Sequence, residues 1–171
     1  MVREKDACEI LRLALENKIK VFLDGGWGVD ALVGKESREH NDIDLFAEEI
    51  DYNAFINVIK NYGFTETVME YTTENHTVWK DDKNRIIDLH KFAYTENKEI
   101  MFEGDIFPSD VFSGKGKIGD IEICCIDAKK QVEFHRGYNF DENDVKDVFL
   151  LCETFGIEVP IEYEKGKKGF E

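Results

Sequence analysis

The chain has 171 residues, and its 42% hydrophobic content is enough for the core of one domain with a small helical extension. Its formal net charge of −15 argues against a nucleic-acid partner, because Lys and Arg carry most of a protein's affinity for phosphate backbones. No apolar run is long enough for a signal peptide or a membrane span, so we expect a cytoplasmic protein without a membrane partner.

Helices and strands alternate in the first third of the chain. Apolar residues recur at helical spacing from the start, with charged residues on the opposite side. The expected elements are a helix at 4–17, a strand at 20–23, a helix at 27–33 closed by Gly34, a strand at 42–46 and a helix at 51–61 with Asp51 as its N-cap.

The remaining sequence predicts a β-meander, an irregular stretch and a helical end. The expected elements are strands at 64–71, 76–80 and 85–92, loops with short strands over 93–119, a strand at 121–126, a helix from the Asp127 cap to about 136, a helix at 142–155 and a frayed end at 164–171. We expect a core of residues 1–126 and a C-terminal helical segment, 127–171, packed on it as one compact unit. The four cysteines lack metal-ligand spacing and are expected to be reduced and buried: Cys8, Cys124, Cys125 and Cys152.

A glycine pair, Gly25 and Gly26, separates the predicted strand at 20–23 from the helix at 27–33. Glycine lets a strand end abruptly and lets backbone N–H groups approach an anion at the start of a helix, where the helix dipole favours negative charge. The pair is therefore a candidate phosphate-binding turn.

Two aspartates, Asp42 and Asp44, lie one residue apart in a predicted strand, so both carboxylates leave on the same face. Asp88 lies on a later strand, and its face meets theirs if the two strands are neighbours. Oxygen ligands of this kind suit one or two Mg²⁺ ions that also contact substrate phosphates. Asp88 is also a candidate general base, with the role of a pure metal ligand as the alternative.

Other polar residues surround these carboxylates in the sequence. Arg38 and His40 alternate on the segment that enters the aspartate strand, where both can face a triphosphate, or else solvent. His90 shares a face with Asp88 and either orients it or contacts the acceptor. Tyr138 is a candidate acceptor contact, with half-buried packing as the alternative.

The run from Leu23 to Leu45, Leu-Asp-Gly-Gly-Trp-Gly-Val-Asp-Ala-Leu followed by Arg-x-His-x-Asp-Ile-Asp-Leu, resembles the antibiotic nucleotidyltransferases of the DNA polymerase β-like fold. The similarity is to the lincosamide nucleotidyltransferases and aminoglycoside 2''-adenylyltransferases, and it extends thinly through residues 88–90 and 134–138. It implies an α+β fold with a small mixed sheet flanked by helices and a C-terminal helical part. It also implies that Gly25 and Gly26 contact the triphosphate and that the aspartate pair binds Mg²⁺, with a later acidic residue completing the site.

The resemblance implies transfer of AMP, or another NMP, from ATP or GTP to a hydroxyl of an antibiotic, which confers resistance. The acidic charge favours a polycationic aminoglycoside as acceptor, whereas the resemblance around residues 134–138 favours a lincosamide. Two other hypotheses remain open, a minimal nucleotidyltransferase that modifies a protein partner, as antitoxin-like enzymes do, and a nucleotide-binding regulator without catalysis. The expected assembly is a monomer or a homodimer.

Overall fold

The computed structural model describes the backbone of residues 1–170 and the side chains of residues 1–165. Its elements in chain order are α1 (Glu4–Glu16), β1 (Phe22–Asp24), α2 (Gly25–Val33), β2 (Ile43–Glu48), α3 (Glu49–Tyr62), β3 (Thr65–Glu66), β4 (His76–Lys80), β5 (Ile86–Tyr94), β6 (Ile100–Phe102), β7 (Asp105–Phe107), β8 (Gly114–Ile118), β9 (Ile121–Cys125), α4 (Ala128–Phe134), α5 (Glu142–Phe155) and α6 (Ile161–Phe170). Among residues 1–170, no helix has the length and apolar character that crossing a membrane requires.

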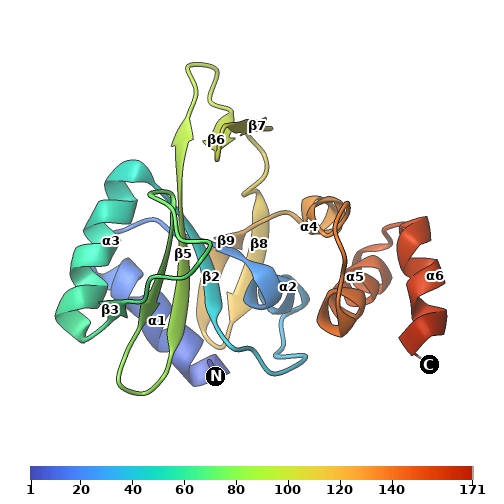
Figure 1. Cartoon of the computed structure of the whole chain (residues 1–171), viewed down its shortest axis with the longest axis horizontal. Helices are drawn as coiled ribbons and strands as arrows, with labels where there is room; N and C mark the ends of the chain where they lie inside the picture. The colour runs from blue at the N-terminus through green and yellow to red at the C-terminus, as the bar shows by residue number, and fades with distance from the viewer. Residues whose placement is uncertain (171) are drawn as a thin grey trace.

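A mixed sheet forms the centre of the molecule, in the order β3-β4-β5-β2-β1-β9-β8 (Figure 1). The strand pairs β2·β5 and β1·β9 are parallel, and the other pairs along this path are antiparallel. The short strands β6 and β7 extend from the end of β5 as an antiparallel ribbon. This mixed sheet, flanked by helices, confirms the expected α+β class.

The alternation of residues in β2 and β5 gives the sheet two different faces. Ile43 and Leu45 in β2, and Ile87 and Leu89 in β5, are fully buried in a core that also contains the apolar sides of α1 and α3. Successive side chains of a strand point to opposite faces, so the residues between these apolar positions face the other way. That second face carries the polar residues of the candidate site.

The C-terminal helices α4, α5 and α6 lie at one end of the molecule, beside α2 (Figure 1). Val29 of α2 is buried in a second apolar cluster with Val132 of α4, Val148 and Leu151 of α5, and Tyr163 of α6. Burial of these side chains from four helices attaches the C-terminal segment to the helix that follows the glycine pair.

Several predicted boundaries differ from the structure. The strand expected at 64–71 was wrong beyond Glu66, because only Thr65 and Glu66 form ladder pairs with β4. Helix α2 begins at Gly25 and not at residue 27, because the positive φ of Gly25, 60°, turns the chain directly from β1 into the helix. Helix α3 begins at Glu49 with Glu48 at its N-cap, so Asp51 lies in the first turn and the prediction of an Asp51 cap was wrong. The expected fraying at 164–171 was also wrong for residues 164–170, which belong to α6, and residue 171 lies outside the described residues.

Candidate active site

Three aspartates lie in register on adjacent strands of the polar face. Asp24 of β1 pairs with Asp44 of β2, and Asp44 pairs with Asp88 of β5. The strands β2 and β5 are therefore neighbours, which was the condition for Asp44 and Asp88 to share a face. Sequence reasoning identified Asp44 and Asp88, but it passed over Asp24, whose place at the end of β1 was the available signal.

The carboxylates of Asp24, Asp42 and Asp88 act electrostatically on Asp44 in a partly buried cluster. The pKa of Asp44 is raised to about 6, first by burial and then by the charges of Asp42, Asp24 and Asp88, while a hydrogen bond with His90 acts to lower it. Asp42 directly precedes β2, and its pKa is also raised, by burial and by the charge of Asp88. Crowded carboxylates of this kind fit a cation, because a bound positive charge removes their mutual repulsion.

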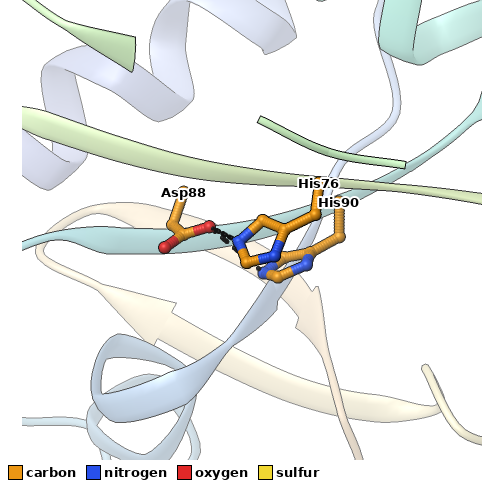
Figure 2. A group of neighbouring side chains, drawn as sticks. All are labelled: His76, Asp88 and His90. Atoms are coloured by element: carbon orange, nitrogen blue, oxygen red, sulfur yellow. Dashed lines mark hydrogen bonds and ion pairs between the residues drawn. The ribbon is translucent and has the colours of Figure 1, made fainter. Parts of the chain in front are cut away.

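Two histidines contact the same cluster from β4 and β5. His90 Nε2 lies 3.6 Å from Asp88 Oδ1 and 3.9 Å from Asp44 Oδ1. His76 Nε2 is hydrogen-bonded to Asp88 Oδ1, and its ring stacks on that of His90 (Figure 2). Burial lowers the pKa of His90, but the hydrogen bond and charge of Asp44 together with the charge of Asp88 outweigh burial and leave the pKa raised.

His76 was missed by sequence reasoning, although a signal for it existed. The predicted hairpin of strands 76–80 and 85–92 has a four-residue turn, and its antiparallel register places His76 opposite His90. Extending the register from the turn would therefore have brought His76 to the face that carries Asp88 and His90.

The glycine pair contacts the residues that follow it in the site. A Cβ atom at Gly25 would lie 2.1 Å from Asp44 Oδ2, and one at Gly26 would lie 2.4 Å from His40 Nδ1 and 2.5 Å from an Arg38 guanidinium nitrogen. No other residue fits at either position without moving these groups. The start of α2 is thus brought together with Asp44, Arg38 and His40, the residues that the sequence analysis grouped with this candidate phosphate-binding turn.

Arg38 and His40 are each fixed by a buried aspartate. Arg38 donates two hydrogen bonds to Asp147 of α5, at 2.9 and 2.7 Å, and these bonds raise its pKa. His40 is 3% exposed, and its Nε2 lies 2.6 Å from Asp30 Oδ2. Both side chains lie beside the start of α2, but their orientation depends on partners that the sequence did not reveal.

Asp147 lacked a local signature in the sequence. Its neighbour Lys146 pairs with Glu142 at 2.8 Å. The contact between Asp147 and Arg38 spans 109 residues and depends on the packing of α5 beside α2.

A largely apolar pocket of about 370 Å³ opens beside the carboxylates. Its wall includes Asp24 and Phe46, and His90 stacks on Phe46 at 4.6 Å between ring centroids. The other lining residues come from the β5–β7 ribbon, the loop before β8, the end of β9, and α4 with the residues after it: Ile100, Phe102, Phe107, Val111, Phe112, Ile126, Glu133, Phe134 and Arg136. Tyr138 is not among them, since its hydroxyl donates to Asp144 at 3.1 Å. The structure therefore places His90 next to the pocket wall, whereas Tyr138 belongs to the contacts before α5.

Comparison with known proteins gives consistent matches over most of the chain. A model described as aminoglycoside-2''-adenylyltransferase matches residues 7–151. A lincosamide resistance protein from Staphylococcus haemolyticus is 32% identical over 152 residues, which cover 86% of this chain and 92% of that protein. The crystal structure of the lincosamide antibiotic adenylyltransferase LnuA with lincomycin bound has a TM-score of 0.78 at 31% identity, covering 92% of this chain and 99% of that one. ANT(2'')-Ia in complex with adenylyl-2''-tobramycin has a TM-score of 0.70 at 16% identity, covering 98% and 95%, and shows likeness of fold alone.

Proposed function

Because the chain belongs to the aminoglycoside-2''-adenylyltransferase family, we propose that it transfers a nucleoside monophosphate from ATP or GTP, with Mg²⁺, to a hydroxyl group of an antibiotic. The observation that carries this proposal is the in-register set of Asp24, Asp44 and Asp88. Asp42 precedes the strand of Asp44, and Gly25 lies against the Asp44 carboxylate. The arrangement combines carboxylates for a metal ion with a helix start for phosphates.

The phosphate side of the site is formed by the start of α2. Gly25 and Gly26 let Asp44, Arg38 and His40 approach the first turn of α2 closely, and the N–H groups and helix dipole at this helix start favour an anion. Arg38 adds a guanidinium held in place by Asp147. His40, held by Asp30, presents its other ring nitrogen beside Gly26. These groups support binding of the triphosphate at this helix.

The donor set fits Mg²⁺, which prefers carboxylate oxygen ligands. Asp42 and Asp44 would hold the ion, with Asp88 as a further ligand, and burial together with the charges of the neighbouring aspartates raises the pKa of Asp44. When bound, Mg²⁺ would neutralise phosphate charge and align the attacking and leaving oxygens.

Asp88 is the proposed general base for the acceptor hydroxyl. Its Oδ1 is engaged by His76, so the second carboxylate oxygen is the one that can accept the hydroxyl proton. The acceptor oxygen then forms a bond to the α-phosphorus as the bond to the bridging oxygen breaks, and pyrophosphate leaves with that electron pair.

The pocket beside Asp24 and Phe46 supports a lincosamide as the acceptor. Its wall is dominated by aromatic and aliphatic side chains, which suit a ligand with an apolar body. The relative from Staphylococcus haemolyticus is named a lincosamide resistance protein. A polycationic aminoglycoside would be attracted by the acidic surface, but it would find in this wall only two carboxylates, Asp24 and Glu133, and Arg136 beside them.

Incubation of the purified protein with ATP or GTP, Mg²⁺ and a panel of lincosamides and aminoglycosides tests the proposal. Mass spectrometry should detect a lincosamide that has gained the mass of AMP or GMP. Modification of aminoglycosides alone would refute the acceptor assignment. Nucleotide on a protein, with no modified antibiotic, would favour a protein-modifying enzyme, and no transfer at all despite nucleotide binding would favour a regulator.

A further inference from the structure

Two imidazole rings and one carboxylate converge at a single point on the polar face. His76 and His90 are paired across the β4·β5 ladder, and Asp88 lies two residues before His90 on the same face. Nε2 of His76 is hydrogen-bonded to Asp88 Oδ1, and Nε2 of His90 lies 3.6 Å from the same oxygen (Figure 2). The centroids of the two imidazole rings lie 4.2 Å apart. The ligand atoms of the three residues all lie within 4.8 Å of one another.

The mixture of donors differs from that of the Asp42 and Asp44 pair. Imidazole nitrogen suits Zn²⁺, Co²⁺, Ni²⁺ and Cu²⁺, whereas Mg²⁺ prefers oxygen and keeps most of its water. We propose that His76, Asp88 and His90 form a second cation site, selective for a nitrogen-preferring transition metal ion such as Zn²⁺ or Co²⁺, and that its occupation inhibits nucleotidyl transfer by occupying Asp88. The inhibition rests on the proposed function, whereas the binding does not.

The geometry requires only small side-chain movements. Ligands around a four-coordinate Zn²⁺ stand about 3.3 Å apart, given bond lengths of about 2.0–2.1 Å to nitrogen and oxygen. The separation of 3.6 Å between His90 Nε2 and Asp88 Oδ1 is already close to this value. His76 Nε2 and Asp88 Oδ1 are hydrogen-bonded, and a metal ion would bind between these two atoms in place of that hydrogen bond.

The surroundings predict an exchangeable ion. All three side chains are partly accessible, with between 12% and 21% of each exposed, so solvent or a substrate oxygen can fill a fourth position. Within the described part of the chain, Nδ1 of His90 is buried without a hydrogen-bond partner. Ligand histidines normally donate from their second nitrogen, and loss of such a partner weakens metal affinity by about 10- to 100-fold.

Cobalt binding measures the site without any reaction. The full-length protein, freed of metal with a chelator, is titrated with Co²⁺ while visible absorption is recorded, since four- or five-coordinate Co²⁺ absorbs far more strongly than six-coordinate Co²⁺. The wild-type protein should show the strong band, and His76→Gln and His90→Gln should each weaken Co²⁺ binding by about 10-fold or more. The matched control is His135→Gln, a histidine whose Nε2 lies 3.8 Å from Asp144 Oδ1 outside this cluster, and it should bind Co²⁺ as the wild type does.

A weak, six-coordinate spectrum in the wild type, or Co²⁺ binding that survives both substitutions in proteins with native circular dichroism, would overturn the site. Zn²⁺ added to the Mg²⁺-supported reaction should inhibit the wild type, and His76→Gln should need about 10-fold more Zn²⁺ for the same inhibition of its own activity. Equal sensitivity of wild type and variant would overturn the inhibitory role. Histidine-dependent Co²⁺ binding without antibiotic modification would count against the proposed function alone, and modification without such binding would count against the site alone.

Discussion

Asp44 and Asp88 stand directly opposite each other on the parallel strands β2 and β5, and both carboxylates lie on the face away from the main core. Their neighbours in the two strands, Leu45 and Leu89, are fully buried on the other side. A shift of either strand by one residue would exchange the polar and apolar sets, so burial of the leucines also fixes the position of the aspartates. The hydrophobic core thus sets the register on which the candidate site depends.

Replacement of Asp88 tests its proposed role as the general base. Asp88→Asn keeps the size of the side chain but cannot accept the hydroxyl proton, so we expect transfer to fall by about 10²- to 10⁴-fold. Binding of the Mg²⁺-nucleotide complex, measured by calorimetry, should remain detectable because Asp42 and Asp44 are intact. Near-normal turnover in this variant would exclude the assignment of Asp88 as base.

A methyl group at Gly25 should lower the rate of nucleotidyl transfer more than it lowers stability. In Gly25→Ala, the new Cβ would meet Asp44 Oδ2 at 2.1 Å, and displacement of a catalytic group by about 1 Å lowers rates by about 100-fold. Gly34→Ala is the matched control, because Gly34 also has a positive φ, 84°, but has no atom within 4 Å of the added methyl. Both variants should lose about 1–2 kcal/mol of stability from backbone strain.

Activity and thermal unfolding of the two glycine variants are measured in parallel. Only Gly25→Ala should lose transfer beyond what its fraction of folded protein explains. If the two variants lose activity to the same extent, the close approach of Gly25 to Asp44 does not contribute to nucleotidyl transfer.

The link between Arg38 and Asp147 connects the phosphate side of the site to the C-terminal helices. In Asp147→Asn the buried carboxylate, 2% exposed, loses its charge, and breaking a buried ion pair destabilises a protein by up to about 3–5 kcal/mol. The freed Arg38 should also raise the KM for the nucleotide. Urea unfolding and steady-state kinetics check the two effects.

Glu142→Gln is the control on the same helix, because it removes only an exposed pair with Lys146 and should change stability by less than about 1 kcal/mol. Equal unfolding midpoints for the two variants would show that the Arg38–Asp147 pair does not hold α5 in place.

Local patterns in the sequence predicted most of the elements and the polar face that carries the candidate site. The period-two alternation around Asp44 and Asp88 predicted their shared face, and the helical period of residues 142–155 gave the bounds of α5 as the structure has them. The family resemblance stated from the motif at residues 23–45 is confirmed by the match over residues 7–151. These features depend on neighbours in the chain, which a single sequence displays.

Features that arise only from tertiary packing were not visible. Arg38 meets Asp147 across 109 residues, and a contact of that span has no local pattern. Helix α6 contains glycines that disfavour a helix, but Tyr163 is fully buried, stacks on Phe140 and donates to the backbone carbonyl of His135. Burial of this one side chain stabilises a helix that its local propensity does not predict.

The free energy of unfolding should depend on pH at acidic values because of Glu9. The hydrogen bond from Tyr62 and then the Arg85 guanidinium lower the pKa of Glu9 below its ordinary value of 4.5. The ionised carboxylate therefore stabilises the folded state above that value, and the contribution is lost as pH falls through the lower folded-state pKa. The difference in unfolding free energy between wild type and Glu9→Gln should be constant near neutral pH and shrink below about pH 4.5.

Urea unfolding at a series of pH values measures this difference. Glu133→Gln removes a surface pair with Lys130 and serves as the comparison; it should change stability by less than about 1 kcal/mol. A difference for Glu9→Gln that stays the same down to strongly acidic pH would mean that Glu9 has an ordinary pKa in the folded protein.

The aromatic wall of the pocket should determine affinity for the acceptor and not for the nucleotide. Phe134 lines the pocket and meets Phe107 edge to face, with ring centroids 5.6 Å apart. Phe134 is 37% exposed, so Phe134→Ala should weaken acceptor binding by about 1 kcal/mol, which corresponds to a roughly fivefold rise in KM for a lincosamide.

The control, Phe155→Ala, removes a similarly exposed residue, 43%, from the end of α5, outside the pocket, and should leave that KM unchanged. Because the proposed nucleotide site is at the start of α2, calorimetry should give the same nucleotide affinity for both variants. A change in turnover with an unaltered lincosamide KM in Phe134→Ala would place the acceptor elsewhere on the polar face.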